Sequence, residues 1–213
     1  MTFVKVPRPI IAFLAFLWGF AAAPEVHAKS PYIGNLTVVN SPDGLQVNAT
    51  LINGFTRKVM EAIQSGVPIT LQYDIELKER HSILPDENIV KRAIERSVVY
   101  NSLNKEYKFT SIQGNQNETV SLTKMRDIRD RMVQLQNVQV ISAKFLKPNE
   151  EYYIRVRSQM NAKNYWFPFN YILFFVDFLN FETPWVESAT IVINQFPVTN
   201  ERNQKEELPE ELP

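Results

Sequence analysis

Cysteine is absent from this chain of 213 residues, and glycine and histidine are scarce. Without thiols the protein cannot form a disulfide, a thiolate metal site, a cysteine nucleophile or a bacterial lipid anchor on cysteine. The six glycines form no phosphate-cradling loop. Apart from His27 the only histidine is His81, so zinc and iron sites lack the additional imidazole and thiolate ligands that they usually take. We therefore predict neither a cofactor nor a metal.

An excess of charge is also missing, because 23 basic residues balance 23 acidic ones. Nucleic-acid binding is not predicted, since it needs a basic excess that displaces counterions. His81 ends a predicted strand, and no nucleophile-elbow motif accompanies it. Two carboxylate pairs, Asp74 with Glu76 and Asp127 with Asp130, stand among basic residues on polar faces, which is typical of a solvated surface. We therefore do not expect an enzyme.

A long run of apolar residues lies near the start of the chain. Ile10 to Ala23 is apolar over 14 residues, follows Lys5 and Arg8, and precedes the small residues of Val26-His27-Ala28. This layout is typical of a secretory signal peptide cleaved after Ala28, and it is short of the about 20 residues that a membrane span needs. We predict an exported, periplasmic protein. The alternative is an uncleaved anchor that holds the protein on the inner membrane, facing the periplasm.

After residue 28 the chain alternates apolar and polar residues in several segments, which predicts strands with one buried face. The clearest segment is Ile69 to Lys78, where five apolar residues face one side and five polar residues the other. Ser41-Pro42-Asp43-Gly44 is a turn that joins two earlier strands into a hairpin. The hairpin strands cover residues 32–39 and 45–51. The remaining strands are predicted over residues 107–111, 138–145, 151–160 and 185–196, and residues 89–100 are predicted to form an edge strand.

Two helices interrupt these strands. The first covers residues 56–65, where Thr56 is placed to cap the amide groups and Gly66 to end the helix. The second starts at Ser121, since Leu122, Met125 and Ile128, then Met132 and Leu135, recur at helical spacing. Residues 197–213 contain EELPEELP and are predicted to be a disordered acidic tail.

This order predicts an α+β fold that is mainly antiparallel β, a β-sandwich-like (immunoglobulin-like) domain with about two interrupting helices. The domain is expected to span residues 29–196, between the signal peptide of residues 1–28 and the tail. Its length suits a single core without disulfides.

The second unusual segment is Tyr165 to Phe181, whose sequence is YWFPFNYILFFVDFLNF. Asp177 makes a membrane span unfavourable. Three interpretations remain: a core helix over residues 171–179, peripheral membrane contact through residues 165–181, or an exposed patch that binds an envelope protein. The candidate anchors of such a patch are Trp166, Phe169, Phe174, Phe175 and Trp185.

Several blocks of the chain together resemble a known family. They are LINGFTRKVMEAIQSGVPITLQYDIEL, RSVVYNSLNKEYKF, EYYIRVRSQM and the ending PWVESATIVI of an aromatic-proline segment. The chain resembles the bacterial exported family called domain of unknown function 4390, over roughly Tyr32 to Phe196. The resemblance implies an envelope protein of Gram-negative-type bacteria with no assigned activity, and it carries over no functional residues.

These observations together favour a non-enzymatic interaction module of the bacterial cell envelope. Two alternatives of other classes remain open. One is an envelope hydrolase that uses paired carboxylates, which needs two carboxyl groups facing each other across a cleft. The other is a carrier of a lipid or small ligand, with the aromatic segment lining a cavity.

Overall fold

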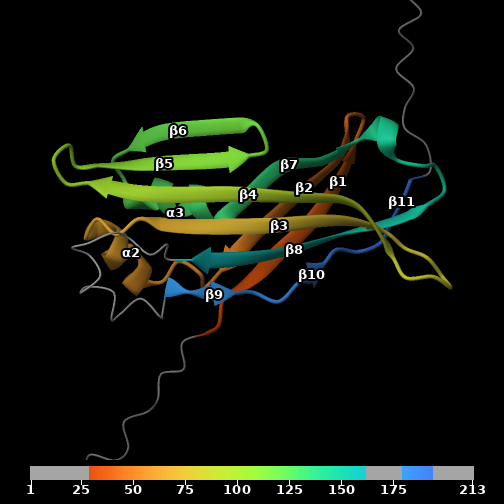
Figure 1. Ribbon diagram of the computed structural model, residues 1–213, viewed down its shortest axis with the longest axis horizontal. Coiled ribbons are helices and arrows are strands. Elements are labelled where there is room, and N and C mark those ends of the chain that lie inside the picture. Colours follow the sequence, from red (N-terminus) through yellow and green to blue (C-terminus); the bar gives the residue numbers. More distant parts are fainter. Residues whose placement is uncertain (1–28, 162–178, 194–213) are drawn as a thin grey trace, which may run out of the picture.

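The computed structural model describes residues 29–161 and 179–193 (Figure 1). The expected signal peptide, the expected acidic tail and most of the aromatic segment lie outside these residues. The described part is mainly antiparallel β with two helices and a sandwich-like arrangement of two sheets, which confirms the predicted fold class. None of its helices has the length and apolar character needed to cross a membrane.

The smaller sheet has three strands in the order β1-β2-β7, all antiparallel. β1 (Tyr32–Ser41) and β2 (Gly44–Ile52) form the predicted hairpin, and the far side of β2 pairs with β7 (Gln134–Ser142). In Figure 1 these strands run obliquely behind the larger sheet. The alternation of β2 places Leu45, Val47, Ala49 and Leu51 inside, as the sequence predicts.

The larger sheet is built on β3 (Ile69–Glu79), which lies between β4 (Glu87–Asn101) and β8 (Glu151–Asn161). Beyond β4 come β5 (Glu106–Gln113) and β6 (Gln116–Leu122). Three short strands pair in turn with the other side of β8, namely β9 (Phe181–Glu182), β10 (Val186–Glu187) and β11 (Ile191–Val192). They form an interrupted edge in place of the continuous strand predicted from residue 185.

Two helices lie at one end of the sheets (Figure 1). α2 (Arg57–Gln64) follows the prediction: the Thr56 hydroxyl accepts a hydrogen bond from the Val59 amide at 3.3 Å, and Val59 and Ile63 are buried. α3 (Met125–Val133) is shorter than predicted, because the chain from Gln116 to Leu122 is strand β6. The helical spacing was therefore real only between Met125 and Met132.

Two further predictions are wrong in detail. The strand over residues 89–100 is not an edge strand, because β4 pairs with β3 on one side and β5 on the other. The strand predicted over residues 138–145 begins earlier, at Gln134, and gives way to the short 3₁₀ helix η1 (Ala143–Phe145). The first error arises because the partner of a strand is not encoded in its own sequence pattern.

The core fills the space between the two sheets. One face of β3 supplies side chains with no exposed surface, among them Leu71, Tyr73 and Ile75. They pack in a single apolar cluster with residues of β2, β7 and β8. The opposite face of β3 carries the polar residues, so the period of two in the sequence decides which residues are available for a site.

Candidate functional site

The outer face of β3 and β8 carries two ion pairs in register. Asp74 lies opposite Arg157, and Glu76 lies opposite Arg155. Arg157 Nε is 2.9 Å from Asp74 Oδ2, and Arg155 Nη2 is 2.6 Å from Glu76 Oε2. Lys91 on β4 adds a second cation, with Nζ 3.2 Å from Glu76 Oε1. The ion pairs therefore hold the charged side chains of this face in fixed positions.

Trp185 lies over the two arginines of these ion pairs. Its ring centroid is 4.4 Å from Arg155 Cζ and 4.7 Å from Arg157 Cζ, which is cation–π geometry with both guanidinium groups. The indole is half-buried and lines an open depression of about 380 Å³. We call Asp74, Glu76, Arg155, Arg157 and Trp185 the tryptophan–arginine patch.

The ionisation of Glu76 follows from these contacts. Burial alone would raise the pKa of Glu76, but its hydrogen bonds and charge interactions with Arg155 and Lys91 together hold the pKa below the usual range. A glycosidase acid needs the opposite shift. In the second carboxylate pair, Asp130 contacts Arg126 and Arg129 on α3, and Asp127 is exposed. The carboxylates that form these contacts therefore act as ion-pair partners of arginine.

Only one of the five predicted anchors lies in the described part of the chain. Trp185 is that anchor, and its partners are arginines of β8. Trp166, Phe169, Phe174 and Phe175 lie outside the described residues, so their part in binding stays a prediction. At the end of the aromatic segment, Leu179 is buried and Phe181 is half-buried.

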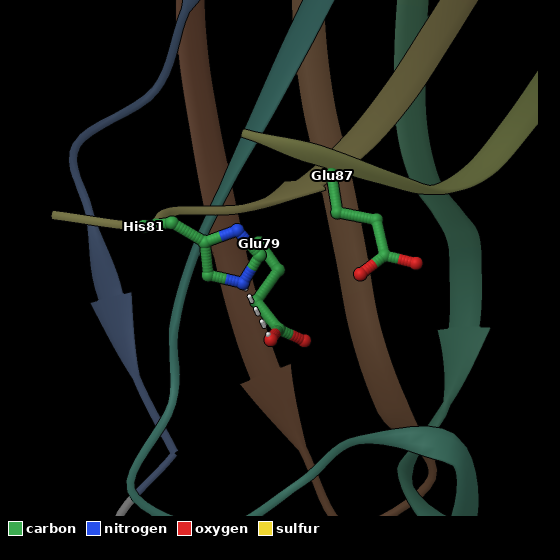
Figure 2. Close-up of side chains that lie close together, drawn as sticks. All are labelled: Glu79, His81 and Glu87. Atoms are coloured by element: carbon green, nitrogen blue, oxygen red, sulfur yellow. Dashed lines mark hydrogen bonds and ion pairs between the residues drawn. The ribbon is translucent and has the colours of Figure 1, made fainter. Parts of the chain in front are cut away.

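A second cluster forms where β3 ends and β4 begins, and sequence reasoning did not find it (Figure 2). It consists of Glu79, His81 and Glu87, whose ligand atoms all lie within 4.8 Å of one another. His81 Nε2 is 3.1 Å from Glu79 Oε1, and its Nδ1 is 3.3 Å from the Pro85 carbonyl oxygen. His81 is half-buried, and each of its ring nitrogens has a hydrogen-bond partner.

Glu79 is the buried member of this cluster. Burial alone would raise the pKa of Glu79, but hydrogen bonds from His81 and Lys147 outweigh it, and the pKa is lowered overall. The contact with Glu79 in turn raises the pKa of His81. The sequence could have revealed this cluster. Glu79 follows Ile75 and Leu77 on the face of β3 that points to the core, and a buried carboxylate requires a cationic partner.

A groove lies between the two sheets, where β4 passes beside the outer edge of β7. Its volume is about 780 Å³, and its apolar lining includes Ile89 and Val90 of β4 and Phe145 of η1. Arg92 also lines it and donates from Nε to the Val140 carbonyl oxygen at 2.6 Å. Its lining is mixed, because the polar side chains of Gln113, Asn115, Gln116, Gln139 and Ser142 also face it.

Comparison with known proteins identifies a family for this chain. A family model described as Domain of unknown function (DUF4390) matches residues 28–188. No curated protein and no solved structure matches the chain. The match spans both sheets as far as β10, and thus the tryptophan–arginine patch and the Glu79 cluster.

Proposed function

The chain belongs to the family described as Domain of unknown function (DUF4390), and from that premise we propose that it is a non-enzymatic interaction module of the bacterial cell envelope. Its proposed place is the periplasm, since residues 1–28 have the layout of a signal peptide. An uncleaved segment that anchors the same domain to the inner membrane is the alternative. In both cases the domain faces the periplasm.

The observation that carries this proposal is the tryptophan–arginine patch. Trp and Arg are the residues that contribute most to protein interfaces, and they do so best when held in one conformation before binding. Here Asp74 and Glu76 fix the two guanidinium groups, which in turn support the half-buried indole of Trp185. The side chains of this patch would therefore lose little additional conformational entropy when a partner binds.

The chemistry of the patch indicates a protein partner. Its floor has charges of both signs, and its centre is an aromatic ring beside the depression lined by Lys91 and Gln159. A protein segment with an apolar side chain and a neighbouring carboxylate matches this arrangement. The carboxylates are occupied by arginine, which supports binding over hydrolysis at this face.

Site-specific photo-crosslinking tests the proposal. A photoreactive phenylalanine analogue at Gln159, which lines the depression, should give one protein adduct of defined mass in the producing cells. Trp185→Ala should remove most of the adduct, because loss of a central interface residue costs about 2 kcal/mol, or roughly thirtyfold in affinity. The adduct is identified by mass spectrometry.

The matched control places the same photoreactive residue at Thr119, which is exposed on β6. No adduct is expected there. An adduct at Thr119 equal to that at Gln159, or an adduct at Gln159 that persists in folded Trp185→Ala protein, would contradict the proposal. Far-UV circular dichroism establishes that each variant is folded.

The groove between the sheets favours a second candidate function, a carrier of a lipid or small ligand. Binding sites for small molecules are concave and combine apolar contacts with polar groups that set orientation. Ile89, Val90 and Arg92 supply both kinds of contact within a volume of about 780 Å³. The ligand class that fits is an amphipathic molecule with an anionic group.

A further inference from the structure

The two carboxylates of the Glu79 cluster face each other across neighbouring strands. Glu79 on β3 is the register partner of Glu87 on β4, so their side chains lie on the same side of the sheet. Like charges in this position are unfavourable. The side chain of Glu79 is only 4% exposed, and a buried carboxylate needs a cation nearby. The strand register therefore places two carboxylates side by side at a point where a cation would stabilise both.

His81 is oriented in the manner of a metal ligand. Its Nδ1 lies 3.3 Å from the Pro85 carbonyl oxygen, which can only accept, so Nδ1 carries a hydrogen. Nε2 points at the Glu79 carboxylate, 3.1 Å away, and either a proton or a metal ion on Nε2 can bridge the two groups. Metal-binding histidines usually donate their second ring N–H to a backbone carbonyl in this way.

We infer that Glu79, His81 and Glu87 form a binding site for a divalent transition-metal ion, for which Zn²⁺ is the best match. One imidazole and two carboxylates are a ligand set that Zn²⁺ accepts, whereas Mg²⁺ and Ca²⁺ prefer oxygen ligands alone. Bonds of about 2.0–2.2 Å place tetrahedral zinc ligands roughly 3.3–3.5 Å apart. The ligand atoms here lie within 4.8 Å, so a small movement of the exposed Glu87 completes the site.

Lys147 competes with the metal for the same carboxylate. Its Nζ lies 3.3 Å from Glu79 Oε1 and 3.2 Å from Glu79 Oε2. Its side chain is 63% exposed, so the ammonium group can move into solvent when a metal ion enters. The ammonium group supplies the positive charge in the metal-free protein, and the metal replaces it. Because Lys147 and the metal compete for Glu79, removing Lys147 should strengthen metal binding, which is not expected if the cluster is only a structural ion pair.

Isothermal titration of Zn²⁺ into the purified full chain, made without a histidine tag, tests the site. One ion per chain is expected, and Co²⁺ should give the absorption bands of an ion with a nitrogen ligand. His81→Ala and Glu79→Gln should each weaken Zn²⁺ binding at least about tenfold, since even the loss of an outer hydrogen-bond partner of a metal site costs that much. Lys147→Met should tighten binding, because it removes the competing ammonium group.

The control is Asp127→Asn on α3, an exposed carboxylate outside the cluster, which should bind Zn²⁺ as the parent chain does. Two results would overturn the inference: equal Zn²⁺ affinity in the parent, His81→Ala and Glu79→Gln chains, or weaker binding by Lys147→Met. Should Glu79→Gln fail to fold, His81→Ala still decides the question, because His81 follows the end of β3 and is half-buried. Binding of Zn²⁺ does not depend on the proposed protein partner.

Discussion

At the scale of single residues, Arg96 connects the two sheets. Its Nη1 donates to the carbonyl oxygens of Arg131 at 2.6 Å and Gln134 at 2.7 Å, where α3 ends and β7 begins. Tyr73 beneath it donates its hydroxyl to the Met132 carbonyl oxygen at 2.8 Å. The last carbonyl groups of a helix lack partners within the helix, and a cation there is favourable. Two side chains of the larger sheet thus complete the end of α3.

Replacing Arg96 with methionine should lower the free energy of unfolding by about 1–3 kcal/mol, because the carbonyl groups of Arg131 and Gln134 lose a charged donor. Urea unfolding followed by circular dichroism measures the change. Arg126→Met is the matched control: its side chain is 82% exposed and its ion pair with Asp130 is long, at 3.9 Å, so the expected change is under about 0.5 kcal/mol. Equal losses in both variants would contradict this role of Arg96.

At the scale of elements, the pairing of β2 with β7 depends on Gly44. Its φ is +132°, which side chains rarely adopt, and a Cβ atom would lie 2.0 Å from the Ile141 carbonyl oxygen and 2.9 Å from the Ser142 Cα. Both atoms are backbone of β7 and cannot move without disturbing the sheet. The turn that the sequence predicted from Pro42 and Gly44 is therefore also a point of close contact between strands.

Gly44→Ala should destabilise the protein much more than Gly114→Ala. Gly114 also has a positive φ, +57°, but a Cβ atom added there would meet no described atom within 4 Å, so only the backbone cost of about 1–2 kcal/mol applies. At Gly44 an overpacking cost of about 1–3 kcal/mol is added. Thermal unfolding of both variants is the measurement, and equal melting temperatures would show that β7 tolerates the added methyl group.

The elements also show why the prediction of strand partners failed. β4 has the β-branched residues expected of a strand, but its interior position results from the hairpin of β5 and β6, which continues the sheet. Leu122 and Met125 fit one helical stripe, yet a strand ends at Leu122 before α3 starts. Local spacing does not distinguish a helix from a strand followed by a helix when both bury the same apolar side chains.

At the scale of the whole molecule, the two sheets separate enough on one side to leave the groove of about 780 Å³. If the protein carries a ligand there, native mass spectrometry of protein purified from its own cells should show an added mass that denaturation removes. Ile89→Trp, which fills the groove, should abolish the added mass. Val99→Trp, elsewhere on β4, should retain it because Val99 does not line the groove. Protein with no added mass would speak against the carrier function.

The sequence by itself determined the local features. Alternation predicted β2 and β3 and the face that each buries, Thr56 and Gly66 bounded α2, and Asp74 and Glu76 of the patch were placed on a polar face. These features depend on neighbours within one strand or one helical turn. Trp185 became a candidate anchor because it follows an aromatic-rich segment, and its role in binding stays a prediction.

Only the tertiary structure decided which residues meet. Trp185 reaches Arg155 across the edge of β8, Arg96 reaches the end of α3, and Glu79 meets His81, Glu87 and Lys147 at the end of β3. These contacts depend on strand register and on the packing of one sheet against the other. Both are set by the sum of many long-range contacts, which no single stretch of sequence contains.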